Sequence, residues 1–178
     1  MWHRDDVVIR PAVAADREWI TSTLVERWGS TVVVGKGRQL DAASLEAIVA
    51  ANEAGDVELE RVGLLTYRLD ALGLEVVTID ALVPGAGIGT ALLAHARHIA
   101  TRAGVTRLWL ITTNDNLGAL GFYERRGFRI IAVHRGAVDW ARALKPSIPL
   151  IAENGIELHD ELELELELAR VAGPAPVA

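Results

Sequence analysis

The sequence VPGAGIGTALLAHARHIATRAGVTRLWLITTNDNLGALGFYERRGF, residues 83–128, is the most informative part of this chain. It opens on a glycine-rich turn, and apolar residues then recur at helical spacing until Gly104, which is expected to end a helix. The next apolar run, 108–113, shows little alternation and predicts a strand buried on both faces. A second helix is predicted over 116–126, with Gly127 in the C-terminal capping position. The stretch therefore predicts a strand-to-helix turn, a buried strand and a short helix within one unit.

Composition and charge narrow the class of protein. The chain has 178 residues, which predicts a single domain over 1–172, and the proline-containing end 173–178 is expected to be disordered. The formal net charge of −6 argues against nucleic acid as a partner, because phosphate binding draws on a surplus of basic residues. Cysteine is absent from the sequence, which excludes a disulfide framework and a thiol nucleophile.

Membrane attachment is not expected. The sequence contains no run of about 18 apolar residues that could form a transmembrane helix. Residues 1–6 are mostly polar and charged and no apolar run follows them, so no signal peptide is predicted. These features favour a cytoplasmic protein.

Further strands and helices are predicted on both sides of the central stretch. Apolar and β-branched runs that predict strands lie at 7–10, 31–34, 62–68, 74–82 and 128–133, and helical patterns lie at 15–28 and 137–144. The short loop between 62–68 and 74–82 predicts antiparallel neighbours. The segment 41–52 has two interpretations. Its alanine content and a possible Asp41 cap favour a helix, and the alternative is a strand over 47–51.

The sequence ELELELEL, residues 161–168, alternates strictly and predicts a strand with four leucines on one face and four glutamates on the other. The glutamate row is interpreted as a solvated face or as a set of charge partners for neighbouring strands, and it could also attract a polyamine. As an edge strand, this segment could pair across a homodimer.

The glycine turn has the properties of an anion cradle. Gly85, Gly87 and Gly89 allow the backbone to turn tightly and to bring its N–H groups close to a ligand. The start of the following helix adds free donors and a positive dipole end, which suit a pyrophosphate. A turn that only packs a strand closely against a helix is the alternative. The residues predicted to contact the ligand are Leu82, Val83, Gly85, Ala86, Gly87, Ile88, Gly89 and Thr90.

A second motif follows the buried strand. Asn116, Ala119 and Tyr123 are spaced so that they share one helix face, and Phe122 precedes the tyrosine. In this order the two motifs resemble the signatures of the GNAT superfamily of acyl-CoA-dependent N-acyltransferases. The chain departs from the first signature at Pro84, where a glutamine or arginine is usual. That change removes a side-chain contact and leaves the backbone cradle.

The chain also resembles a bacterial GNAT subgroup of unassigned substrate. The shared segments are RWGS at 27–30, GLLTY at 63–67, TTNDN at 112–116, LKPSIP at 144–149 and DELELE at 160–165. The resemblance implies an α/β fold with a mixed, mostly antiparallel twisted sheet and helices on both faces. It also favours the strand interpretation of 47–51.

The resemblance further implies acetyl-CoA as cosubstrate and a small-molecule or peptide amine as acceptor. Asn116, with Ala119 and Phe122, would contact the coenzyme, and Tyr123 would lie beside the thioester sulfur. A phenol there can protonate the departing thiolate, because the two groups have pKa values of about 10 and 8.5. An alkylamine with a pKa of about 10.4 needs a base, for which Glu75 is the first candidate and Asp80 the second.

Two other functions fit parts of the sequence. A non-catalytic acyl-CoA-binding module of the same fold would keep the glycine turn without using Tyr123. A Rossmann-type dinucleotide-binding protein would use the turn together with Asp115, but Thr90 stands where its third glycine is needed. No metal is expected, because His95 and His98 have no evident third ligand. The long connection 136–159 is expected to border the acceptor site.

Overall fold

The computed structural model describes residues 7–52 and 60–169 of the chain. The predicted tail 173–178 and the N-terminal residues 1–6 lie outside the described residues. Within the described part, no helix is long and apolar enough to cross a membrane.

Strands and helices alternate irregularly along the chain. The strands are β1 (Val7–Pro11), β2 (Val32–Gly35), β3 (Arg38–Asp41), β4 (Glu46–Asn52), β5 (Glu60–Asp70), β6 (Gly73–Ala81), β7 (Arg107–Thr113), β8 (Arg129–His134) and β9 (Glu161–Glu167). The helices are α1 (Arg17–Trp28), α2 (Ile88–Arg102), α3 (Leu117–Glu124) and α4 (Ala137–Leu144).

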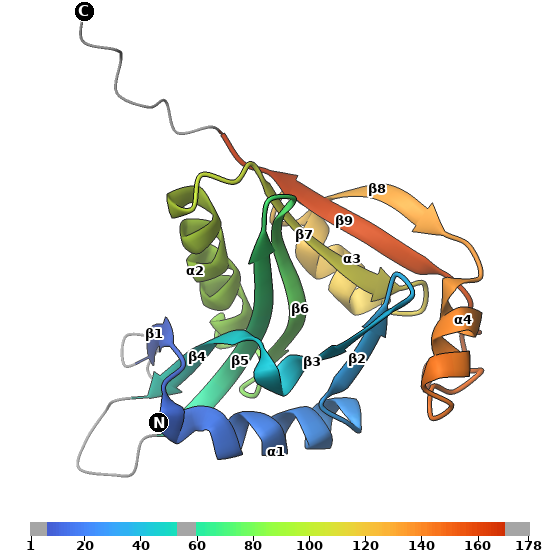
Figure 1. Cartoon of the computed structure of the whole chain (residues 1–178), viewed down its shortest axis with the longest axis horizontal. Helices are drawn as coiled ribbons and strands as arrows, with labels where there is room; N and C mark the ends of the chain where they lie inside the picture. Colours follow the sequence, from blue (N-terminus) through green and yellow to red (C-terminus); the bar gives the residue numbers. More distant parts are fainter. Residues whose placement is uncertain (1–6, 53–59, 170–178) are drawn as a thin grey trace, which may run out of the picture.

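Seven of these strands form one sheet in the order β1-β4-β5-β6-β7-β9-β8. Neighbouring strands are antiparallel except β6 and β7, which are parallel (Figure 1). The predicted fold, a mixed and mostly antiparallel sheet, is therefore confirmed. The segment 41–52 contains the expected strand as β4, and the Asp41 side chain caps only a short 3-10 turn, Ala42–Ser44.

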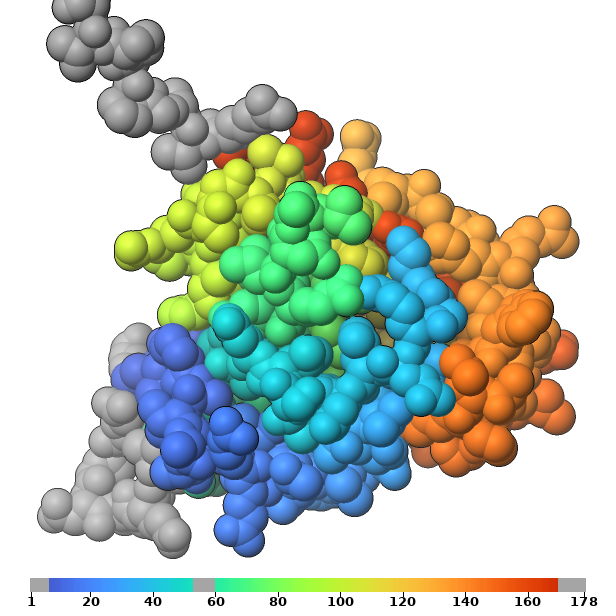
Figure 2. All heavy atoms as spheres, in the orientation of Figure 1, coloured from blue at the N-terminus to red at the C-terminus, as the bar shows by residue number. Residues whose placement is uncertain are grey.

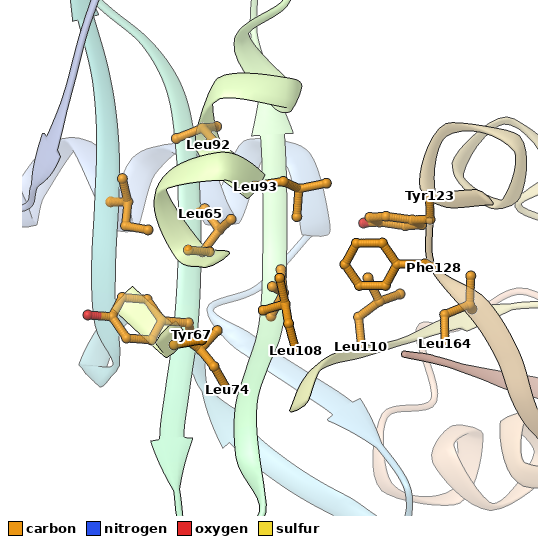
Figure 3. Packing of buried hydrophobic residues seen from close by; sticks show 14 of the residues in the cluster. Leu65, Tyr67, Leu74, Leu92, Leu93, Leu108, Leu110, Tyr123, Phe128 and Leu164 are labelled. Atoms are coloured by element: carbon orange, nitrogen blue, oxygen red, sulfur yellow. The ribbon is translucent and has the colours of Figure 1, made fainter. Parts of the chain in front are cut away.

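Helices cover both faces of the sheet. On one face, α2 and α3 enclose the larger apolar core, which includes Leu65, Leu74, Leu92, Leu108, Leu110, Tyr123, Phe128 and Leu164 (Figure 3). On the other face, α1 packs Ile20 and Leu24 against Ala47 and Leu64. A side chain on Gly63 would lie 2.5 Å from Ile88 Cγ2, so this glycine lets the first turn of α2 approach the sheet.

The remaining two strands, β2 and β3, form a separate hairpin on the α1 side. Figure 2 shows its residues, in light blue, between the green β5–β6 strands and the orange α4 region. Charged groups at the hairpin tip fix it to the sheet. Lys36 Nζ lies 2.9 Å from Glu163 Oε2, and Arg38 Nη2 lies 2.9 Å from Glu75 Oε1. The backbone N–H of Lys36, a residue with φ of 50°, donates to Glu161 Oε2.

Of the two interpretations of the ELELELEL glutamates, the charge-partner interpretation holds for Glu163 and Glu165, which pair with residues of other strands and of the hairpin. The solvated-face interpretation is wrong for Glu161 and Glu163, since they are only 2% and 4% exposed. The hairpin covers them. The segment is also not an edge strand, because β9 lies between β7 and β8 and pairs with both. The strand edge that was expected to pair across a homodimer is therefore already occupied.

Glu163 pairs with three basic residues on the hairpin side of the sheet. Its carboxylate accepts from Lys36, His134 and Arg107, which belong to the hairpin, β8 and β7. Burial opposes its ionisation, but the hydrogen bonds from these three residues outweigh burial and lower the pKa of Glu163 to about 2.

We predict that Glu163→Gln lowers the free energy of unfolding by about 3 kcal/mol at pH 7, because it removes the buried carboxylate that pairs with the partly buried cations Lys36 and Arg107. The folded-state pKa lies below the ordinary value of 4.5, so the contribution is complete above that pH and is lost as the pH falls toward 2. Urea denaturation at pH 7 and pH 3 measures the difference. Glu167→Gln, an exposed change on the same strand face, is the control. An equal deficit at both pH values would contradict the assignment.

Candidate functional site

The candidate site begins where the two parallel strands separate. Their pairing runs from Leu74 to Val76 on β6 and from Leu108 to Leu110 on β7. Beyond these residues β6 continues to Ala81 and β7 to Thr113, and each keeps only its antiparallel neighbour. The facing edges therefore carry backbone N–H and C=O groups that a ligand can bind.

A cavity of about 630 Å³ occupies this gap. Strands β6 and β7 form two of its walls, and the glycine turn and α3 form the others. It is lined by ten of the predicted site residues, namely Val83, Gly85, Gly87, Ile88, Gly89, Thr90, Asn116, Ala119, Phe122 and Tyr123. The two sequence motifs, separated by the whole of α2 and β7, are thus brought to one cavity.

The glycine turn takes a conformation that side chains disfavour. Gly85 and Gly87 have φ values of 76° and 78°, in the left-handed region. Gly87 is the N-cap of α2 and provides no side-chain cap, so the first-turn N–H groups of the helix stay free for a ligand. Gly89 lies against the Phe122 ring, where a Cβ would approach to 3.1 Å.

Tyr123 is held by aromatic neighbours. Its ring lies 5.2 Å from Phe122 and 5.5 Å from Phe128 between centroids, and its hydroxyl points toward the sheet (Figure 3). The side chain is buried but lines the cavity. Burial and the negative charge of Asp80 raise the pKa of Tyr123 above its ordinary value. The phenol therefore keeps its proton at neutral pH and can donate it to a ligand.

The end of α3 adds a cation beside the glycine turn. Arg126 lines the cavity, donates to Thr90 Oγ1 through Nε at 3.1 Å, and lies over the Phe122 ring at 3.6 Å. Burial and the neighbouring Arg125 lower the pKa of Arg126. An anion bound at the turn would offset both effects. Asn116 caps α3 by accepting from the Ala119 N–H at 3.3 Å.

The two candidate bases occupy different places on β6. Asp80 lines the large cavity with Tyr123 and accepts from Trp28 Nε1 at 2.8 Å and from Arg27 Nε at 3.4 Å. Glu75 does not line that cavity. It lies where β6 and β7 are still paired, between Arg38 and Arg68, and borders a smaller cavity under the hairpin.

Two predicted contact residues do not line the large cavity. The Leu82 N–H donates to Val62 O and extends the sheet, and Ala86 packs against the apolar core. Arg27 and Trp28 line it without having been predicted, although the RWGS segment that contains them was noted. Among residues 7–52 and 60–169, no three His, Cys, Asp or Glu side chains are grouped to hold a metal ion.

The connection 136–159 supports the hairpin and α1 from outside. Lys145 Nζ donates to Val32 O at 3.0 Å and to Trp28 O at 3.2 Å. Arg142 donates to three carbonyls of its own segment and pairs with Asp139. The contacts of Arg142 therefore hold the segment together. Residues 136–159 line neither of the two cavities at the strand separation.

Known proteins with similar sequences include acetyltransferases, which fits the cavity described above. The acetyltransferase (GNAT) family matches residues 43–128. The uncharacterized protein YdhI of Bacillus subtilis is 36% identical over 156 residues, which cover 88% of this chain and 95% of YdhI. Streptothricin acetyltransferase of Streptomyces lavendulae is 31% identical over 120 residues, 64% of this chain and 62% of that protein.

Solved structures of acetyltransferases have the same fold as this chain. The IAA acetyltransferase from Bacillus cereus superposes with a TM-score of 0.66 and 26% identity, covering 91% of this chain and 99% of that one. The fold, the cavity and these relatives define an acetyltransferase. The chain belongs to the GNAT family.

Proposed function

We propose that this protein is an N-acetyltransferase that moves the acetyl group of acetyl-CoA to a primary amine. One observation carries the proposal: the glycine turn and Tyr123 line the same cavity, at the separation of β6 and β7. An anion cradle and a proton donor in one cleft suit a thioester attached to a pyrophosphate. A GNAT structure from Elizabethkingia anophelis with acetyl-CoA bound has the same fold, with a TM-score of 0.63.

The coenzyme would be held by backbone and by one cation. The pyrophosphate would accept from the N–H groups of the turn and of the first turn of α2. Pro84 offers no side-chain donor there, and Arg126, in the turn after α3, supplies positive charge to the same cavity. The pantetheine amides would bond to the free edges of β6 and β7, in place of the strand pairing that ends at Val76 and Leu110.

The chemical step is a direct transfer. The amine nitrogen attacks the thioester carbon, a C–N bond forms, and the C–S bond breaks. Tyr123 donates its proton or a hydrogen bond to the departing sulfur, and the nitrogen loses a proton to a base on β6. Burial raises the pKa of Tyr123, and burial of the thiolate raises its basicity as well, so the two groups stay comparable.

The cradle predicts that Gly87→Asp and Gly89→Asp each abolish acetyl-CoA binding. Both changes add bulk and negative charge where the backbone must meet the pyrophosphate, and Gly89 has the Phe122 ring against it. Calorimetry measures the dissociation constant. Gly118→Asp is the matched control, since an added Cβ there meets no atom within 4 Å and the residue lies outside the cavity. Unchanged affinity in folded Gly87→Asp and Gly89→Asp would refute the cradle.

Tyr123→Phe keeps the ring packing and removes only the donor. We expect kcat to fall by about 10²–10⁴-fold while acetyl-CoA affinity stays the same, because a positioned acid acts mainly in the transition state. Single-turnover kinetics with a responsive amine separates the two effects. A kcat within about twofold of the unsubstituted enzyme, with chemistry rate-limiting, would favour a non-catalytic role for the phenol.

The base is assigned by comparing Glu75→Gln with Asp80→Asn. We expect the acidic limb of the kcat/KM profile to disappear in one variant and to persist in the other, because only the true base must be deprotonated. Glu75 is the first candidate, and Asp80 shares the cavity of Tyr123. Persistence of the limb in both variants would place the base away from β6.

A further inference from the structure

A second cavity, of about 140 Å³, lies under the β2–β3 hairpin. Its apolar wall comes from Val33, Val34 and Leu40 of the hairpin, and Trp28 borders it as well. Val76, Val77, Ile111, Thr112 and Asn116 line both this cavity and the large one. The two cavities therefore meet at the strand separation, where the proposed thioester would lie. A second reactant could reach it from the hairpin side.

Two carboxylates border the second cavity, and their charges are compensated differently. Glu75 has Arg38 at 2.9 Å and Arg68 at 3.3 Å, although its Oε2 accepts no hydrogen bond within the described chain. Glu161 is 2% exposed, and its Oε2 accepts a hydrogen bond from the Lys36 backbone N–H at 2.8 Å. No cation lies within 4.0 Å of Glu161 among residues 7–52 and 60–169.

The nearby cations are directed to other carboxylates. Lys36 Nζ and His134 both reach Glu163, two residues along the same strand face, and Arg107 pairs with Glu163 and Glu165. Within the described part of the chain, Glu161 is thus a deeply buried carboxylate without an ionic partner, at the edge of a cavity with apolar walls. Burying an unpaired carboxylate costs free energy, and a cation bound beside it would offset that cost.

We infer that Glu161 binds the amino group of the acceptor, and that the acceptor presents a primary amine on a short apolar chain. The inference rests on the proposed function and adds the acceptor class and the residue that recognises it. The cavity volume matches about five non-hydrogen atoms at about 30 Å³ each, which is the size of n-butylamine. Glu161 orients the nitrogen toward the thioester, and the proton leaves to the base on β6.

The inference also explains the alternating glutamates. Glu163 and Glu165 hold Arg107, and Glu163 also holds Lys36 and His134. Glu167 is exposed. Glu161, the first residue of β9, is opposite Thr113, the last residue of β7, which places it at the open end of the strand separation. One strand face thus anchors the hairpin through Glu161 and Glu163, and the buried Glu161 has no ionic partner among residues 7–52 and 60–169, so its charge can bind a ligand.

The experiment uses n-butylamine as the probe and 1-butanol as its uncharged counterpart. Each is titrated into CoA-saturated protein while tryptophan fluorescence is followed, because Trp28 borders the cavity. Turnover is followed separately by a thiol reagent with acetyl-CoA. The sequence has no cysteine, so the reagent detects only released CoA.

We expect n-butylamine to bind more tightly than 1-butanol, and Glu161→Gln to weaken amine binding by about thirtyfold or more. Glutamine keeps an acceptor for the Lys36 N–H, so the fold and the acetyl-CoA affinity should be retained. Glu167→Gln should leave amine binding unchanged.

Equal binding of amine and alcohol, or an amine affinity in Glu161→Gln within about twofold of the unsubstituted protein, would overturn the inference. A parallel loss of acetyl-CoA affinity in Glu161→Gln would also overturn it, by showing a structural role. Amine binding that depends on Glu161 without any CoA release would support the cation site and reject N-acetyl transfer instead.

Discussion

The structure depends on one interruption in hydrogen bonding. β6 and β7 are the only parallel neighbours among the described strands, and their pairing stops at Val76 and Leu110 although both strands continue. Buried backbone N–H and C=O groups need hydrogen-bond partners. A ligand with amide groups can supply these partners where the pairing of β6 and β7 stops. The glycine turn at the end of β6 and the helix α3 after β7 border the resulting cavity. A continuous sheet at this position would leave no cleft for a thioester.

The two faces of the interrupted sheet have different chemistry. The α2 and α3 face is apolar and holds Tyr123 through Phe122 and Phe128, which raises the pKa of the phenol by burial. The hairpin face is ionic, with the carboxylates of β6 and β9 meeting cations from the hairpin tip and from neighbouring strands. The separation of β6 and β7 connects the faces. In the proposed function, a coenzyme bound on one face and a second reactant bound on the other would meet at this separation.

Membership of the GNAT family explains the framework, and the departures from its usual signature define this chain. Pro84 replaces a residue that would offer a side-chain donor, and Arg126 brings a guanidinium to the same cavity from another element. The hairpin is fixed by Lys36, whose backbone N–H and side chain bind two successive glutamates of β9. These contacts tie the shape of the cavity under the hairpin to the ELELELEL strand, which lies far away in the sequence.

Sequence reasoning alone predicted most of the helices and strands and ten residues that line the large cavity. Helical spacing, strand alternation and glycine positions are local properties, so the turn, α2, β7 and α3 were predicted with small boundary errors, as was the gathering of Asn116 and Tyr123 on one helix face. Which glutamates of β9 are buried depends on the tertiary structure, because strand alternation assigns them to one face of the sheet but does not show that the hairpin covers that face. The tertiary structure also decided that β9 is internal, that Glu75 lies outside the cavity of Tyr123, and that Trp28 lies inside it. These facts depend on strand order and on the hairpin that folds across the sheet, and both arise from contacts between residues far apart in the chain.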